Sequence, residues 1–427
     1  MTASEALQIL RVRPQTLYAN VSRNRIRAKP DPKDTRRSLY HETDVRKLAR
    51  KQGGRRKATV VAAGAIEWGD PVLSSAISTV VDGRLYYRGK DAVGLSVAAT
   101  LEEVAGLLWG AEAVDFERAW GDATPTLRAD IHDTRTRRSR TAAVGSESLP
   151  VVLSGAREKL PGNPLQRAFH ALAQRASADL SSHGRALPVL QAEAAAVLVT
   201  LASTLLEPES ASRSDGRQLP RARELGRCVT LHERVADAFG RRSVADILRR
   251  VLVLMADHEL NASTFATRVA VSTGAPLSAG VLSGLATLSG PLHGRAALGV
   301  LELFASAERL GAEGAVRDWL SQGRPIVGFG HPLYPAGDPR ATALLTQLAL
   351  PRLYSDLSDA VENVIGERPN IDFALAALTK VHRLPPEAPL ILFALGRCAG
   401  WLAHALEQVT TGHPIRPRAR YVGPPVR

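Results

Sequence analysis

Four short segments carry residues that could do acid–base chemistry. They are "ADHELNAST" around His258, "SGPLHGRAALG" around His293, "GFGHPLYPAGDPRA" around His331 and "RPNIDFALAAL" around Asp372. Imidazole and carboxylate groups are common proton donors and acceptors in enzymes. His293 and His331 lie at breaks rich in Gly and Pro, where the backbone can approach a ligand closely. This combination favours a reaction that moves a proton at a bound substrate.

Structural roles compete for the same residues. A single histidine is more often a core residue than a catalytic one, and an Asp at the start of a helix is by default an N-cap. Zinc binding is another alternative, but no pair of these histidines has the i, i+4 spacing of a helical zinc site. The functional prediction therefore depends on the four segments taken together.

The body of the chain is predicted to be helical. Apolar residues recur at intervals of three and four in runs such as "LEEVAGLLWG", "AEAAAVLVTLASTLL" and "VADILRRVLVLMADH". One hairpin is expected in "AISTVVDGRLYYRG", where Asp82-Gly83 separates two β-prone runs. No G-x-G-x-x-G or Walker loop is present, which argues against a dinucleotide-binding or P-loop enzyme.

Composition places the chain among soluble globular proteins of two to four domains. It has 427 residues, of which 45% are hydrophobic and 23% charged. No run of 18 uncharged apolar residues occurs and the N-terminus lacks the pattern of a signal peptide, so neither a membrane span nor secretion is expected. With only Cys228 and Cys398, a cytoplasmic protein without a disulfide framework or a thiol metal site is predicted.

The net charge of +13 is concentrated at one end. Residues 1–57 hold 16 Lys/Arg against 5 Asp/Glu, a net charge of +11, whereas the rest of the chain holds 39 against 37. A small module with so much positive charge predicts a polyanionic partner. A solvated basic tail is the alternative, but it would lack the apolar periodicity found here.

Residues 1–57 read as a winged helix-turn-helix. "SEALQILRV", with Ser4 as its N-cap, and "RPQTLYANVSRN" are predicted helices, followed by a turn, a basic strand and a third helix. The pattern resembles the DNA-binding modules of excisionases and MerR-type regulators. That resemblance implies DNA binding, and a vestigial or protein-docking module is the alternative. Base edges would be read by Gln15, Thr16 and Asn20, and phosphates contacted by Arg13, Arg23, Arg36 and Arg37.

The four chemical segments resemble the citrate synthase family, in its order and at approximately its spacing. The resemblance runs from about residue 62 to the end, including "GRCAGWLAHALEQ" and "RPRARYVGP", and is weak between about 112 and 225. It implies an all-α fold with a large domain at 58–287 and 396–427 and a small domain at 288–395, after the module at 1–57. It also implies a homodimer that uses an acyl-CoA and oxaloacetate, with no cofactor and no metal.

The resemblance assigns catalytic roles to three residues. His293 would hydrogen-bond the carbonyl oxygen of the thioester, and Asp372 would remove a proton from the carbon beside that carbonyl. His331 would hydrogen-bond the ketone of the keto acid and protonate it as the carbon–carbon bond forms.

Substrate binding would fall to four more residues. His258 would contact the keto acid, and Arg340, Arg397 and Arg416 would hold its carboxylates, with Arg416 reaching in from the partner subunit. A planar guanidinium can pair with a carboxylate through two hydrogen bonds, so arginine suits this task.

Departures from the family pattern leave the function open between alternatives. Pro332 and Pro335 replace basic residues that lie near the CoA phosphates in many bacterial members, and Arg295 replaces a small residue. The first hypothesis is an enzyme that makes citrate from acetyl-CoA, or 2-methylcitrate from propionyl-CoA. The second is a DNA-binding regulator. Its citrate synthase-like body, from residue 58 on, would form a dimer that senses a metabolite and places the two basic modules at 1–57 on a palindromic DNA site.

Overall fold

The computed structural model describes residues 1–10, 17, 20–21, 26–31, 34–46, 73–112, 114–123, 163–207, 230–417 and 422–424. The chain divides into two compact units. The first unit comprises Met1–Ala76, Val80–Arg84 and Arg295–Pro389, and the second comprises Ile77–Thr79, Leu85–Gly294 and Leu390–Arg427. The Arg295–Pro389 segment lies within the range predicted for the small domain, 288–395.

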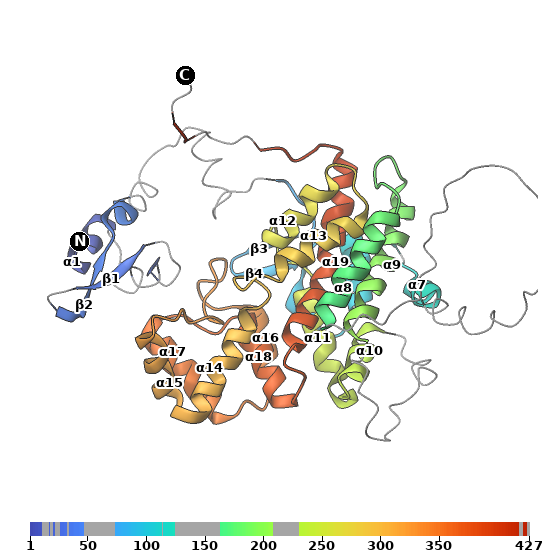
Figure 1. Ribbon diagram of the computed structural model, residues 1–427. Coiled ribbons are helices and arrows are strands. Elements are labelled where there is room, and N and C mark those ends of the chain that lie inside the picture. The colour runs from blue at the N-terminus through green and yellow to red at the C-terminus, as the bar shows by residue number, and fades with distance from the viewer. Residues whose placement is uncertain are drawn as a thin grey trace, which may run out of the picture. The chain divides into compact units, whose positions relative to one another are not determined.

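The second unit consists mainly of helices, as the apolar periodicity predicts (Figure 1). Its helices are α5 (Ala92–Ser96), α6 (Leu101–Trp109), α7 (Phe116–Ala123), α8 (Pro164–Ala178), α9 (Leu187–Leu205), α10 (Leu231–Ala238), η3 (Arg242–Val244), α11 (Ala245–Met255), α12 (Ala262–Val271), α13 (Leu277–Leu288) and α19 (Ala388–Thr411), whose first two residues belong to the first unit.

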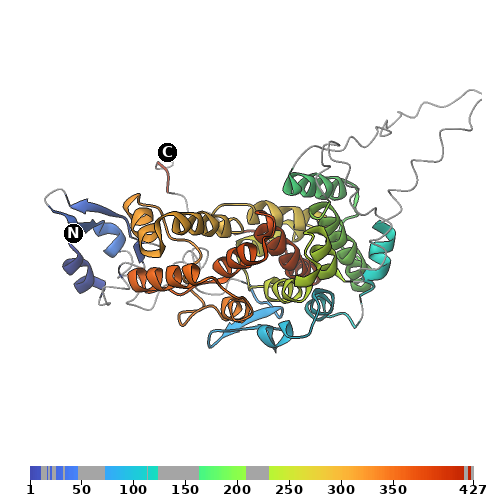
Figure 2. The same cartoon turned by 90° about the horizontal axis from the view of Figure 1, so that it is seen from below.

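Helix α19 runs through the core of the second unit, and both views draw it among the neighbouring helices (Figures 1 and 2). The Trp109 indole of α6 donates to the carbonyl of Ala399 at 2.9 Å. Gly396 lets α19 approach closely, because a Cβ there would lie 2.7 Å from Met255 Cβ at the end of α11. Cys398, on the same helix, is buried, and burial raises the pKa of its thiol.

Two helices of the described chain are long and apolar enough to cross a membrane, α9 and α19. All of the apolar window of α19 is buried inside the protein, and 44% of that of α9. Burial in the core accounts for the apolar character of α19.

The predicted hairpin is confirmed. Strands β3 (Ser78–Val81), β4 (Arg84–Tyr87) and β5 (Lys90–Asp91) form a sheet in that order. Asp82 and Gly83 connect the first two strands with φ angles of 50° and 73°. Positive φ at both central residues is what a two-residue turn of this hand requires, and Asp-Gly tolerates it.

The first unit contains a second group of helices: α14 (Ala296–Leu310), α15 (Ala312–Ser321), α16 (Pro339–Leu345), α17 (Arg352–Ile365) and α18 (Ile371–His382). Phe304 of α14 joins them, because its ring stacks on Tyr354 of α17 with centroids 4.2 Å apart and meets Phe373 of α18 edge-on at 5.2 Å. This aromatic cluster anchors the start of α18, which carries Asp372.

The basic N-terminal segment has a small core of its own. Helix α1 (Ala3–Leu10) and the antiparallel strands β1 (Ala28–Asp31) and β2 (Asp34–Tyr40) are followed by a helical turn at 42–46, and residues 17, 20 and 21 are also helical. The buried side chains are Ala6, Leu10, Leu17, Ile26, Tyr40 and Val45. Helix α1 and strand β2 occur where the sequence places a helix and a basic strand, whereas strand β1 was not predicted. The helix-turn-helix assignment itself stays a prediction.

One detail of the N-terminal predictions is wrong. Thr2, rather than Ser4, caps α1: its hydroxyl accepts from the Glu5 N–H at 3.4 Å, and the Glu5 carboxylate accepts from the Thr2 N–H at 2.8 Å. Asn20 is 8% exposed. Its predicted contact with a base edge is not tested.

The other predicted DNA contacts are not tested. Arg36 and Arg37 lie on β2, of which only the backbone is described there. The remaining positions, Arg13, Gln15, Thr16 and Arg23, lie outside the described residues.

Candidate active site

The predicted site residues belong to both units. His331, Arg340 and Asp372 lie in the first unit, whereas the second holds His258, His293, Arg397 and Arg416.

The backbone before His331 is tied to the segment before Asp372. Phe329 forms a β-bridge with Pro369, the Gly330 N–H donates to the Arg368 carbonyl at 2.8 Å, and the Asn370 N–H donates to the Gly328 carbonyl at 2.9 Å. Gly328 and Gly330 have φ angles of 84° and 68°, in the region that favours glycine. The glycines around the imidazole are thus needed for this pairing.

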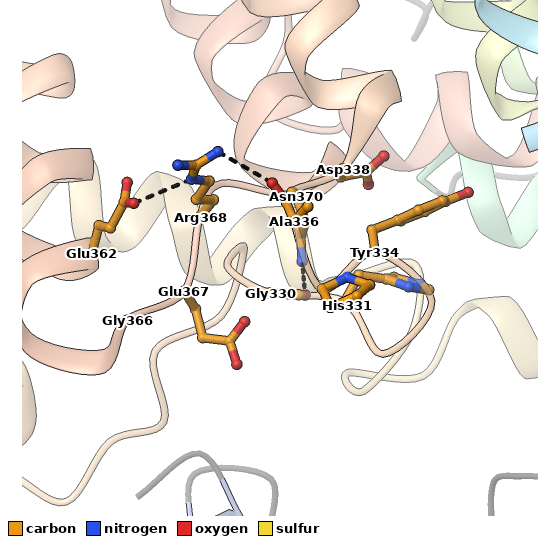
Figure 3. A pocket seen from close by; sticks show the side chains of 12 residues that line it. Gly330, His331, Tyr334, Ala336, Asp338, Glu362, Gly366, Glu367, Arg368 and Asn370 are labelled. Atoms are coloured by element: carbon orange, nitrogen blue, oxygen red, sulfur yellow. Dashed lines mark hydrogen bonds and ion pairs between the residues drawn. The ribbon is translucent and has the colours of Figure 1, made fainter. Parts of the chain in front are cut away.

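Asn370 connects the two candidate catalytic segments through its side chain. Its Oδ1 accepts from the Asp372 N–H at 2.9 Å as the N-cap of α18, and its Nδ2 donates to the Gly330 carbonyl at 3.1 Å (Figure 3). Asp372 therefore is not the cap, the structural role that its position most simply suggests. Its carboxylate lies in the first turn of a helix that another residue already caps.

The turn after His331 sets the tautomer of its imidazole. The Leu333 N–H donates to His331 Nδ1 at 3.1 Å. A ring nitrogen that accepts carries no proton, so in the neutral ring the proton is on Nε2. His331 can therefore donate a hydrogen bond from Nε2.

Arg340 is held by a buried carboxylate. Its Nε donates to Asp338 Oδ1 at 3.0 Å and its Nη2 to Oδ2 at 2.8 Å, and Arg340 is 2% exposed. Asp338 also caps α16 and accepts from the Ile371 N–H at 3.1 Å. Burial raises the pKa of Asp338, but Arg340 outweighs this effect and the pKa is lowered. Asp338 thereby links the Arg340 guanidinium to the start of α18.

His293, in the second unit, is kept neutral by its surroundings. Its Nε2 lies 2.9 Å from Ser263 Oγ, and its ring meets Phe393 edge-on with centroids 5.6 Å apart. Burial and, to a lesser degree, the charge of Arg397 lower the pKa of His293 to about 4. At neutral pH the ring is an uncharged hydrogen-bonding group.

His258 and Arg397 are both buried in the second unit. Arg397 donates from Nε to the Met255 carbonyl at 3.0 Å and lies over the Phe393 ring, 5.0 Å from its centroid. Arg416 is exposed in the segment after α19. Its predicted crossing to a partner subunit is not tested.

Several residues of the site were not singled out from the sequence, although they lie inside or beside the motifs that were. Ser263, Asp338 and Asn370 supply hydrogen bonds to predicted residues, and Asp257 and His404 form a buried pair with His404 Nε2 3.2 Å from Asp257 Oδ2. Their position inside or beside these motifs is the one feature of the sequence that could have identified them. Among the described residues, no group of three or more His, Cys, Asp and Glu side chains could hold a metal ion.

Comparison with known proteins gives a consistent result. The family "Citrate synthase, C-terminal domain" matches residues 66–418. "Citrate synthase 2" of Bacillus subtilis is 39% identical over 192 residues, which is 42% of this chain and 51% of that protein. The match to this relative thus spans only about half of its length. The citrate synthase of Mycolicibacterium smegmatis is 28% identical over 372 residues, covering 83% of this chain and 93% of that protein.

Solved structures share the fold. Citrate synthase from Thermotoga maritima has a TM-score of 0.58 and 28% identity, covering 83% of this chain and 94% of that one. A ternary complex of the Thermoplasma acidophilum citrate synthase has a TM-score of 0.61, with 84% of this chain and 95% of that one covered; at 23% identity it supports the fold alone. Because the family match extends over most of the chain, the protein belongs to the citrate synthase family.

Proposed function

We propose that the protein is a citrate synthase-type enzyme that condenses an acyl-CoA with oxaloacetate and then hydrolyses the thioester. The hydrogen-bonded frame of Asn370 is the observation that carries this proposal. It ties the backbone of Asp372, which carries the carboxylate, to the backbone of Gly330, next to His331, whose imidazole can donate from Nε2. A base and an acid in fixed relation are what carbon–carbon bond formation between a thioester and a ketone needs.

Each group has one task in the proposed reaction. The Asp372 carboxylate takes a proton from the α-carbon, and His293 donates a hydrogen bond to the thioester oxygen as it gains charge. The α-carbon then attacks the ketone carbon, while His331 gives its Nε2 proton to the ketone oxygen. Water finally cleaves the thioester and releases CoA with a free thiol.

A neutral His293 can play its part only in one tautomer. To donate from Nδ1 it must accept at Nε2, where Ser263 Oγ lies at 2.9 Å. The Trp401 indole donates to the same oxygen at 3.1 Å, and the Ser263 hydroxyl donates to Asn261 Oδ1 at 2.7 Å. Ser263 has a single hydroxyl proton, so the proposed role requires this proton to turn from Asn261 to His293 Nε2, which leaves Nδ1–H for the substrate.

The thioester is proposed to be a CoA ester that is held weakly at its phosphates. The turn after His331 lines a cavity of about 320 Å³ (Figure 3). Its described lining includes the carboxylates of Asp338, Glu362 and Glu367 but only one Lys or Arg side chain, Arg368, whose Nε is paired with Glu362 at 3.2 Å. Such a lining disfavours phosphate groups. Membership of the citrate synthase family is the basis for choosing these substrates, which stay part of the proposal.

The decisive experiment measures release of free CoA thiol by the full chain. Acetyl-CoA and propionyl-CoA are supplied separately, each with and without oxaloacetate. Release that requires oxaloacetate supports the condensation, and the ratio of the two rates distinguishes citrate from 2-methylcitrate formation. Asp372→Asn keeps the size of the side chain but removes the base, so it should lower kcat at least about a hundredfold with an unchanged melting temperature. Equal turnover by this variant would exclude Asp372 as the base.

A DNA-binding regulator is the second candidate, because one observation favours it. Residues 1–57 carry almost all of the net charge, and their described part has a separate core. A protein with intact chemistry could combine both functions.

A further inference from the structure

Ser78 of β3 contacts both chain neighbours of His258. Its hydroxyl donates to Asp257 Oδ2 and accepts from the Glu259 N–H at 2.9 Å. Asp257 and Glu259 flank His258 in the chain, and Ser78 lies 179 positions before Asp257. One hydroxyl from a distant strand thus binds the side chain before the histidine and the backbone after it.

The loop that carries His258 needs such a contact. Glu259 has a φ of 50°, a left-handed conformation that costs a non-glycine residue about 1–2 kcal/mol. The Tyr87 hydroxyl of β4 lies 3.2 Å from the Asp257 carbonyl and 3.1 Å from the carbonyl of Leu254 at the end of α11. The β3–β4 hairpin therefore holds the strained loop from one side.

A chain of buried groups holds the acceptor of the Ser78 hydroxyl in place. His404 Nε2 lies 3.2 Å from Asp257 Oδ2, and His404 Nδ1 lies 3.2 Å from Arg268 Nη1. Since a guanidinium can only donate, Nδ1 accepts and the ring proton is on Nε2, directed at Asp257. Arg268 is fixed in turn by Glu407 at 2.5 Å and Gln408 at 2.9 Å.

Asp257 stays an acceptor despite complete burial. Burial raises the pKa of its carboxyl, but His404, the charge of Arg397 and the Ser78 hydroxyl outweigh this, and the pKa is lowered. The carboxylate is thus available to both donors at neutral pH. All of these groups lie in the second unit.

We propose that Ser78 is a positioning residue for keto-acid binding, acting through Asp257 and Glu259 on His258. The inference rests on the proposed contact between His258 and oxaloacetate. The hydroxyl itself touches no substrate. Its two hydrogen bonds set the direction in which the imidazole leaves the loop, and the buried chain from Arg268 to Asp257 keeps that direction constant.

The test compares Ser78→Ala with a matched control in the full-length protein. Ser96→Ala also removes a serine hydroxyl, one that is buried and donates to the Val93 carbonyl at 2.7 Å without touching the loop. Loss of the Ser78 hydroxyl should raise the Kd and KM of oxaloacetate about tenfold and change the KM of the acyl-CoA less than about twofold. Ser96→Ala should leave both unchanged, and Ser78→Thr, which keeps a hydroxyl, should restore oxaloacetate binding.

Two further variants separate the possible failures. Ser78→Cys fills nearly the same space with a weak donor, so it reports on the hydrogen bonds even where the alanine variant does not fold. His258→Ala gives the effect of losing the imidazole itself. Normal oxaloacetate affinity in Ser78→Ala, with weakened binding in His258→Ala, would overturn the positioning role alone. Unchanged affinity in His258→Ala would overturn the proposed role of His258, and thiol release would still report on the condensation.

Discussion

At the scale of single residues, the surroundings of each titratable side chain decide whether it is charged or neutral at pH 7. Asp338 keeps its charge in a buried position because Arg340 pairs with it, whereas His293 is surrounded by apolar and cationic groups that favour the neutral ring. The same chemical types therefore serve different purposes, and their sequence neighbours do not reveal which. That difference leads to a measurable pH dependence.

The neutral state of His293 should make stability depend on pH. Its folded pKa of about 4 lies below the ordinary value of 6.5, so the unfolded chain binds the extra proton first as pH falls. The contribution of His293 to the free energy of unfolding is fully present above pH 6.5. It is lost as the pH falls from 6.5 to 4, with a slope of at most about 1.4 kcal/mol per pH unit. Urea unfolding of the wild type and His293→Gln across this range measures it. An identical slope in the two proteins would contradict the assignment.

Glu367 is predicted to limit the affinity for CoA esters. It lines the cavity beside His331, and its side chain points away from the Glu362–Arg368 pair (Figure 3). Glu367→Lys should lower the KM of acetyl-CoA severalfold at low salt and leave that of S-acetylpantetheine, which lacks the phosphates, unchanged. Glu313→Lys, an exposed reversal on α15, is the matched control. An equal effect of both variants would assign the change to overall charge.

At the scale of elements, local patterns in the sequence were enough for some features but not for others. The period of the apolar residues predicts the helices, and Asp82-Gly83 predicts the hairpin, because both signals arise within a few residues. The capping of α18 by Asn370 was missed, since Asp372 is an equally good cap by type. The link from Ser78 through Asp257 to His404 could not be predicted, because it joins segments far apart in the chain.

Asn370 should matter for activity as well as for stability. Asn370→Ala removes the cap of α18 and the hydrogen bond to Gly330, which should cost about 1–2 kcal/mol and lower kcat at least about tenfold. Asn163→Ala is the matched control, because it removes a comparable cap from α8. Asn163 Oδ1 accepts from the Gln166 N–H at 3.0 Å. Thermal melts and thiol-release rates of both variants provide the comparison. Similar kcat losses in both would refute a special role for Asn370.

At the scale of the whole molecule, the chain combines a nearly neutral body with a strongly basic head. If residues 1–57 bind DNA, full-length protein should retain duplex DNA with an affinity that falls linearly as the logarithm of salt concentration rises. A chain that starts at residue 58 should lose that affinity and keep its rate of thiol release. Gel-shift titrations at several salt concentrations measure the DNA affinity of both chains. DNA affinity that survives the truncation would exclude residues 1–57 as the binding element.

The burial of Cys398 next to Arg397 on α19 also gives the protein an internal reporter. A protonated, inaccessible thiol does not react with an alkylating reagent until the surrounding helices separate, so labelling at this position counts transient openings of the second unit. If oxaloacetate binds at Arg397, it should slow that labelling in proportion to its occupancy. Mass spectrometry of the modified peptide would then measure substrate affinity without any turnover.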